Sequence, residues 1–266
     1  MVERIAVFAA LPWEERAARA SVAGVKRVHA AGWDATWAGH APGREVWLVR
    51  TGIGEERAQA AAEAAARAQR FDAFLSAGCA AGLEPSLRAG DVVVADAVYA
   101  SGGAQRFATD LALRETLADA ARRARVRASV GSHACCGALL ASVADKRRVA
   151  AERGAAVGEM EGAAIARVAL RARVAFGAVR AVLDPLDVAL QHATGIVDPA
   201  SGRVRARGMI RLIGKLASAP GVWPELLAMQ RMMRAARSSL ERVFAALLAE
   251  DPRSHARDEA RVGEGG

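Results

Sequence analysis

The chain has few cysteines and few aromatic residues. It has only three cysteines among 266 residues, Cys79, Cys135 and Cys136, and the last two are adjacent. Adjacent cysteines rarely pair, and no Cys-x-x-Cys or His-rich spacing is present, so the sequence predicts neither disulfides nor a metal site. The absence of a disulfide framework is typical of a reducing compartment, and we expect a cytoplasmic protein.

The sequence also lacks a long hydrophobic run. No uninterrupted apolar stretch reaches the roughly 20 residues that a membrane-spanning helix needs. The first residues carry Glu3 and then an apolar segment up to Pro12, a pattern closer to a buried strand than to a signal peptide. Aromatic residues make up 5% of the chain and apolar residues 53%, many of them alanine. We therefore expect a core of closely packed small side chains.

Short apolar segments alternate with amphipathic ones over residues 1–190, which we predict to be one domain. Strands are expected at 4–11, 25–30, 33–38, 45–49, 72–77, 91–95, 128–133, 137–142 and 174–183. Helices are expected from residue 13 and at 55–70, 111–125, 145–153 and beyond residue 159. This alternation predicts an α/β fold, with a central mixed, twisted β-sheet flanked by helices.

The character of the chain changes after Asp187. Residues 191–250 are predicted to be a basic helical extension, with helices at 207–217 and 223–248, and residues 251–266 to be a disordered tail. Between Arg203 and Arg242, nine basic residues stand against two acidic ones, a net charge of +7.

Two interpretations of this basic segment stay open. It forms either a solvated helical cap or dimer contact, or an interfacial helix that docks on anionic headgroups of the inner membrane. Nucleic-acid binding is a weaker alternative, because the arginines lack interleaved aromatics and a recognisable motif.

The stretch from Val157 to Asp187 is the centre of the functional hypothesis. Glu159 and Glu161 open a run with helical spacing, and an almost purely apolar segment then ends at Asp184. Open α/β sheets bind ligands beyond the carboxyl ends of their strands. A carboxylate at such an end therefore indicates a site, although a helix start and an Asp-Pro turn would explain the same residues.

Two glycine-rich turns follow predicted strands. The turn Gly52-Ile53-Gly54 precedes a helix and would suit an anion on free backbone amides or serve as a plain turn. The segment from Gly78 through Cys79 to Leu83 is built of small residues, which indicates that its backbone closely approaches a ligand or a packed helix.

Four segments in order resemble the nucleoside phosphorylase and nucleosidase family, and most of all the methylthioadenosine/S-adenosylhomocysteine nucleosidases. They are Ile5–Glu14, Gly52–Gly54, Gly78–Val94, and Glu159–Glu161 with Arg180–Asp184. Together with the basic extension, the last segment is similar to the hopanoid-associated subgroup. That resemblance implies an enzyme that releases adenine from adenosylhopane, without a cofactor and as a homodimer.

The resemblance also implies roles for single residues. Asp184 would protonate the purine at N7, and Glu161 would bind the ribose hydroxyls, with Met160 packed on the sugar and Glu159 either a further partner or solvated. Gly78, Cys79, Ile53 and Gly54 would complete the substrate site.

Glu14 bears on the choice between water and phosphate as the nucleophile. A carboxylate there would activate water and repel phosphate, and the family's phosphate-binding arginine has no counterpart in residues 9–11 or 75–77. Hydrolysis is therefore favoured, while Arg50 and Arg57 beside the first glycine turn keep phosphorolysis, with phosphate as co-substrate, open.

The sequence departs from the nucleosidase pattern at three places. Cys79 and Leu183 stand where serines are usual, and the segment 142–146 is short and has no aromatic residue to stack on a base. The alternatives are a methylthioadenosine-type nucleosidase, a purine nucleoside phosphorylase, or a non-catalytic membrane- or nucleic-acid-binding protein on this fold.

Overall fold

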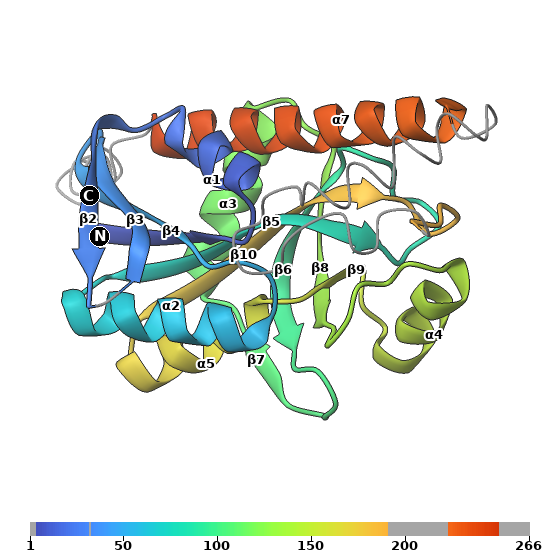
Figure 1. Ribbon diagram of the computed structural model, residues 1–266, viewed down its shortest axis with the longest axis horizontal. Coiled ribbons are helices and arrows are strands. Elements are labelled where there is room, and N and C mark those ends of the chain that lie inside the picture. The colour runs from blue at the N-terminus through green and yellow to red at the C-terminus, as the bar shows by residue number, and fades with distance from the viewer. Residues whose placement is uncertain (1–3, 32, 191–222, 250–266) are drawn as a thin grey trace, which may run out of the picture.

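The protein folds as one mixed β-sheet with helices on both faces, as predicted (Figure 1). The computed structural model describes residues 4–31, 33–190 and 223–249. The predicted helix at 207–217 and the tail at 251–266 lie outside these ranges. Of the helices in the described residues, none is both long and apolar enough to cross a membrane.

The strands follow the chain in the order β1 (Arg4–Ala9), β2 (Ala23–Ala30), β3 (Trp33–Ala41), β4 (Arg44–Arg50), β5 (Ala73–Gly82), β6 (Val92–Tyr99), β7 (Arg106–Ala108), β8 (Ala128–Cys135), β9 (Val157–Glu159) and β10 (Ala175–Asp184). The helices are α1 (Pro12–Arg19), α2 (Glu55–Ala68), α3 (Leu111–Arg123), α4 (Val143–Arg153), α5 (Gly162–Ala172) and α7 (Trp223–Leu248).

The sheet runs in the order β10-β6-β8-β9-β5-β1-β4-β3-β2, and β10 also pairs with β5. Five strands, β5, β10, β6, β8 and β9, therefore form a closed ring of pairings at one end of the sheet. Strands β4, β1, β5 and β10 run parallel to one another. Their carboxyl ends consequently meet at the same edge.

The alternation of side chains along the strands fills two cores. On β1, Ile5 and Val7 face α1, α3 and α7, while Ala6 and Phe8 face α2 and α5. Both faces are buried, which explains why the parallel strands read as continuous apolar runs. The helices contribute mostly alanine, so they pack closely on the sheet.

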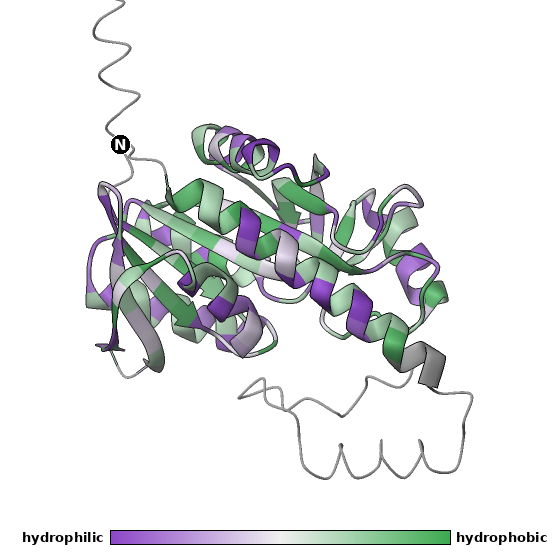
Figure 2. Cartoon of the chain, turned by 90° about the horizontal axis from the view of Figure 1, so that it is seen from above, coloured by the Kyte–Doolittle hydropathy of each residue, from purple (hydrophilic) through white to green (hydrophobic). Residues whose placement is uncertain are grey.

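Helix α7 lies where the sequence predicts it, across the face that α1 and α3 also cover (Figure 1). Hydrophobic and hydrophilic residues both occur along it (Figure 2). Leu240, Val243 and Phe244 are buried in the core, whereas Arg231, Arg234 and Arg237 are exposed. The described arginines of α7 are therefore exposed to solvent, whereas the apolar face of the same helix packs on the domain.

Three local expectations were wrong. Residues 137–142 form a loop instead of a strand, since no neighbouring strand pairs with them and Ser142 caps α4. Strand β5 continues through Gly82 because β1, β9 and β10 supply partners along it. Glu159 ends strand β9, so only Glu161 stands at the start of α5.

Candidate active site

The carboxyl edge of the parallel strands brings together most of the predicted site residues. Glu14 lies in the first turn of α1, directly after β1, and Gly54 follows β4. Asp184 is the last residue of β10 and pairs with Ala81 of β5, two positions beyond Cys79. Segments far apart in the sequence therefore converge because their strands are neighbours in the sheet.

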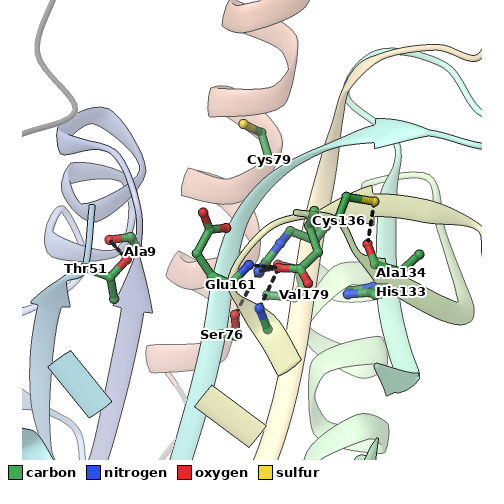
Figure 3. Close-up of polar contacts among 12 residues, drawn as sticks. Ala9, Thr51, Ser76, Cys79, His133, Ala134, Cys136, Glu161 and Val179 are labelled. Carbon is green, nitrogen blue, oxygen red and sulfur yellow. Dashed lines mark hydrogen bonds and ion pairs between the residues drawn. The ribbon is translucent and has the colours of Figure 1, made fainter. Parts of the chain in front are cut away.

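A small cavity of about 10 Å³, room for about one water molecule, opens between these segments. Four predicted residues line it: Glu14, Gly78, Cys79 and Glu161. Cys79 and Glu161 come from β5 and from the start of α5, and Figure 3 shows both. Other predicted residues are absent from the lining: Ile53, Gly54, Glu159, Met160 and Asp184.

Glu14 is buried, with 4% of its surface exposed, and its carboxylate is held from two sides. The backbone N–H of Leu11 donates to Oε2 at 2.8 Å, and that of Cys79 donates to Oε1 at 2.8 Å. Burial raises the pKa of Glu14 above its ordinary value, although the two N–H donors act in the opposite direction. The two hydrogen bonds fix the carboxyl group of Glu14 at the cavity wall.

Gly78 is required by this carboxylate. A Cβ atom at position 78 would lie 2.8 Å from Oε1 of Glu14 and 3.0 Å from its Cδ. The sequence left open whether a ligand or a helix approaches this backbone. In the structure, the group that approaches it is the side chain of Glu14, a residue of α1.

We expect Gly78→Ala to lower the free energy of unfolding by about 1–3 kcal/mol, because the new methyl group overpacks a carboxylate that two hydrogen bonds hold in place. Chemical denaturation would measure this loss. Gly103→Ala is the matched control, since its Cβ would meet no atom closer than 3.9 Å. In a Glu14→Ala background the cost should largely disappear, and an equal cost in both backgrounds would contradict the assignment.

Glu159 and Arg180 form a buried ion pair, so Glu159 is not solvated. Arg180 donates to Oε2 of Glu159 at 2.5 Å and to Oγ of Ser76 at 2.8 Å. Oε2 also accepts from the backbone N–H groups of Glu161 and Gly162 at 3.0 and 2.7 Å. Burial alone would raise the pKa of Glu159, but Arg180 and these donors lower it, so the carboxylate is ionised.

Glu161 stands at the N-terminus of α5 and reaches the first glycine turn. Its Oε1 accepts a hydrogen bond of 2.8 Å from the N–H of Gly54, where φ is +99°. Glycine adopts this φ without strain, which explains its presence. Burial, and next the charge of Glu159, raise the pKa of Glu161 to about 8. This carboxyl group has a much higher proton affinity than Glu159.

Asp184 is buried beside a lysine that the sequence did not point to. Lys146 of α4 is fully buried, and its Nζ is in ion-pair contact with Oδ2 of Asp184, an oxygen with no other hydrogen-bond partner. Burial raises the pKa of Asp184 to about 6, and Lys146 opposes that shift.

Sequence analysis missed the roles of Arg180 and Lys146. Arg180 interrupts an apolar strand, which is a signal for a buried partner. Lys146 shares the inner face of α4 with Val149, a weaker signal. The two arginines that could have bound phosphate, Arg50 and Arg57, do not line the cavity. Arg50 packs over the Trp37 ring at 5.1 Å from its centroid, and Arg57 is exposed.

The described residues contain no group of three or more His, Cys, Asp or Glu side chains placed to hold a metal ion. The site is instead a set of buried carboxyl groups with two buried cations. Fold and site together define an α/β protein with buried carboxyl groups gathered at the carboxyl edge of its parallel strands, the edge at which open α/β sheets bind ligands.

Residues 4–200 match the phosphorylase superfamily, and the chain belongs to that superfamily. This membership confirms the predicted family and with it the prediction of an enzyme.

Solved structures share the fold. The 5′-methylthioadenosine/S-adenosylhomocysteine nucleosidase of Neisseria meningitidis, in complex with methylthio-immucillin-A, is 21% identical with a TM-score of 0.73, covering 93% of this chain and 99% of that one. The Helicobacter pylori futalosine hydrolase is 16% identical with a TM-score of 0.71, covering 93% and 97%. The Streptococcus pneumoniae nucleosidase is 19% identical with a TM-score of 0.71, covering 92% and 99%. A search of curated proteins finds no match.

Proposed function

We propose that the protein hydrolyses the N-glycosidic bond of a purine nucleoside and releases adenine. The observation that carries this proposal is the convergence of three carboxyl groups on one edge of the sheet: Glu14 and Glu161 on the cavity wall, and Asp184 at the end of the adjacent strand β10. Similarity in fold to nucleosidases that bind nucleoside analogues supports it.

The proposed reaction needs an acid at the base and a base at the nucleophile. Asp184 gives its proton to N7, the bond between C1′ and N9 breaks, and its electron pair moves to the purine. Glu14 takes a proton from water as the water oxygen bonds to C1′. Glu161 accepts hydrogen bonds from the ribose hydroxyls, and Met160, half-buried next to it, packs on the sugar.

The charges in the cavity support water rather than phosphate as the nucleophile. Among the described residues that line it, Arg180 is the only cation. Its guanidinium is already paired with Glu159 at 2.5 Å. A phosphate dianion would have to enter this buried site without a free cation to receive it.

Adenosylhopane is the proposed substrate, with the lipid tail at the ribose 5′ position. Support comes from the sequence: Arg180–Asp187 and the basic segment that follows are similar to the hopanoid-associated subgroup. We include in the proposal a homodimer and a peripheral contact of the basic segment with the membrane surface. Most of that segment lies outside the described residues.

The test is adenine release from adenosylhopane, methylthioadenosine and S-adenosylhomocysteine, each with and without phosphate. The proposal predicts release without phosphate and the highest kcat/KM for the lipid-tailed substrate. A preference for methylthioadenosine would identify a nucleosidase of that type, and an absolute need for phosphate a phosphorylase. Binding to anionic vesicles without any adenine release would favour a non-catalytic protein.

Glu14→Gln is expected to lower kcat by about 10²–10⁴-fold, because an amide cannot take the proton of the attacking water. Steady-state rates of adenine release would measure it. Glu15→Gln is the matched control: Glu15 is the next residue, is buried to the same degree and does not line the cavity. Equal losses in the two variants would contradict the role of Glu14.

A further inference from the structure

Lys146 is fully buried, and all its polar contacts go to one short stretch of chain. Its Nζ contacts Oδ2 of Asp184 and donates to the backbone carbonyls of Pro185 and Val188 at 2.8 and 2.7 Å. The carbonyl of Asp184 itself lies at 3.3 Å. An ammonium group has three protons and four acceptors surround it here, so its whole donor capacity is used.

Burying a charge is costly unless it is paired and hydrogen-bonded, and here the counter-charge is the proposed acid. Among the described residues, few other charged or titratable groups face Asp184. Cys79 approaches from β5, Arg180 lies four residues earlier on β10 and is paired with Glu159, and Asp187 in the following turn is exposed. Of the described cations, Lys146 from α4 is therefore the one that acts directly on the Asp184 carboxyl group.

The lysine also ties the chain after the acid to α4, and the loop before α4 contacts the same stretch of chain. Residues 184–188 are tied to α4 through Lys146, and the N–H of Leu190 donates to the carbonyl of Ala141 at 2.8 Å. The chain after Asp184 is thus linked to α4 through Lys146 and to the loop of residues 136–142 through Ala141, so the position of the acid depends on both.

We propose that Lys146 is a positioning residue of the proposed reaction, which fixes Asp184 and the loop after it and stabilises the carboxylate that remains once Asp184 has given its proton to the base. This inference rests on the proposed function. Lys146 does not touch the reacting atoms, because its Nζ is fully occupied by Asp184 and the backbone behind it.

Two opposing effects make the inference measurable. Burial favours the neutral acid and Lys146 favours the carboxylate, and together they place the pKa of Asp184 at about 6. Because the reaction requires protonated Asp184, kcat/KM should fall as the pH rises through that pKa. Removing the cation leaves burial unopposed, so the pKa rises and the fall moves to higher pH.

The experiment compares pH profiles of adenine release for the wild type, Lys146→Met and Lys146→Gln. Both variants are expected to have a lower kcat, with the fall in kcat/KM displaced upward by roughly one to three pH units. Gln is included because it retains donors for the backbone carbonyls. Arg148→Met is the matched control on the exposed side of the same helix, and should keep the wild-type profile.

A purely structural lysine would lower thermal stability and kcat without moving the profile, and that result would overturn the proposal. Failure of both Lys146 variants to fold would also count against it. The proposed function fails separately: the wild type would then release no adenine, or Asp184→Asn would retain full activity.

Discussion

Asp184→Asn is expected to lower the turnover of adenine release by about 10²–10⁴-fold, because an amide has no proton to give to the departing base. The substitution keeps the shape of the side chain at the end of β10. Substrate affinity should change far less than kcat, since the proton is transferred only as the bond breaks. Steady-state kinetics of adenine formation, at a pH below 6, would separate the two constants.

Asp187→Asn is the matched control for this prediction, because Asp187 lies in the turn three residues on and is exposed. The single Asp184 variant leaves the ammonium of Lys146 without its counter-charge, so folding has to be checked by thermal unfolding. The double variant Asp184→Asn/Lys146→Met removes both charges and should be as inactive. Near-normal turnover in a folded Asp184 variant would remove the acid from the mechanism.

Arg180→Met is expected to lower the free energy of unfolding by about 3–5 kcal/mol, since it leaves the Glu159 carboxylate buried without its cation. A loss of that size is a large part of the stability of an ordinary domain. Ser76 also loses its partner, although its hydroxyl is a smaller cost. Chemical denaturation of both proteins would measure the difference.

Arg237→Met provides the control, because Arg237 pairs with Glu241 at 2.7 Å on the exposed side of α7. Exposed pairs of this kind contribute at most about 0.5 kcal/mol. Adding Glu159→Gln to Arg180→Met removes the unpaired charge and should restore part of the stability. If Arg180→Met were no more destabilising than Arg237→Met, the buried ion pair would not make the predicted contribution to the free energy of unfolding.

Local patterns were sufficient to predict the helices and most strands. Helix α7 begins and ends where its apolar spacing placed it, at Trp223 and Leu248. The apolar run before Asp184 proved to be β10, which ends at that residue. Both elements follow from the spacing of apolar residues along the chain, which can be read directly from the sequence.

Which strands pair with one another cannot be read from a short stretch of sequence, and the wrong predictions concern this pairing. Glu159 appeared to open a helix, yet it ends β9 because β5 and β8 offer edges for a short strand. Residues 137–142 have strand-like composition but no partner. The small residues of Gly78–Gly82 suggested a loop, whereas they form the part of β5 that must pass Glu14.

In the candidate site, local pattern drew attention to Glu161, which opens a helix, and to Asp184, which ends an apolar run, whereas Glu14 was indicated by the family resemblance. Lys146 could not be found in that way, since a lysine in a polar helix is normally exposed. Its burial becomes visible only when α4 is placed against the chain that follows Asp184. The charge balance that governs the proposed acid is therefore a property of the tertiary structure.

The most direct measurement of the proposed reaction is product analysis in phosphate-free buffer made with H₂¹⁸O. Incubation with methylthioadenosine or adenosylhopane should yield adenine and, in equal amount, a free sugar with one ¹⁸O atom at C1, detected by mass spectrometry. Glu14→Gln and Asp184→Asn should form both products at least about 10²-fold more slowly. No adenine from either substrate, or adenine only when phosphate is added and with a sugar 1-phosphate as co-product, would contradict hydrolysis of the N-glycosidic bond.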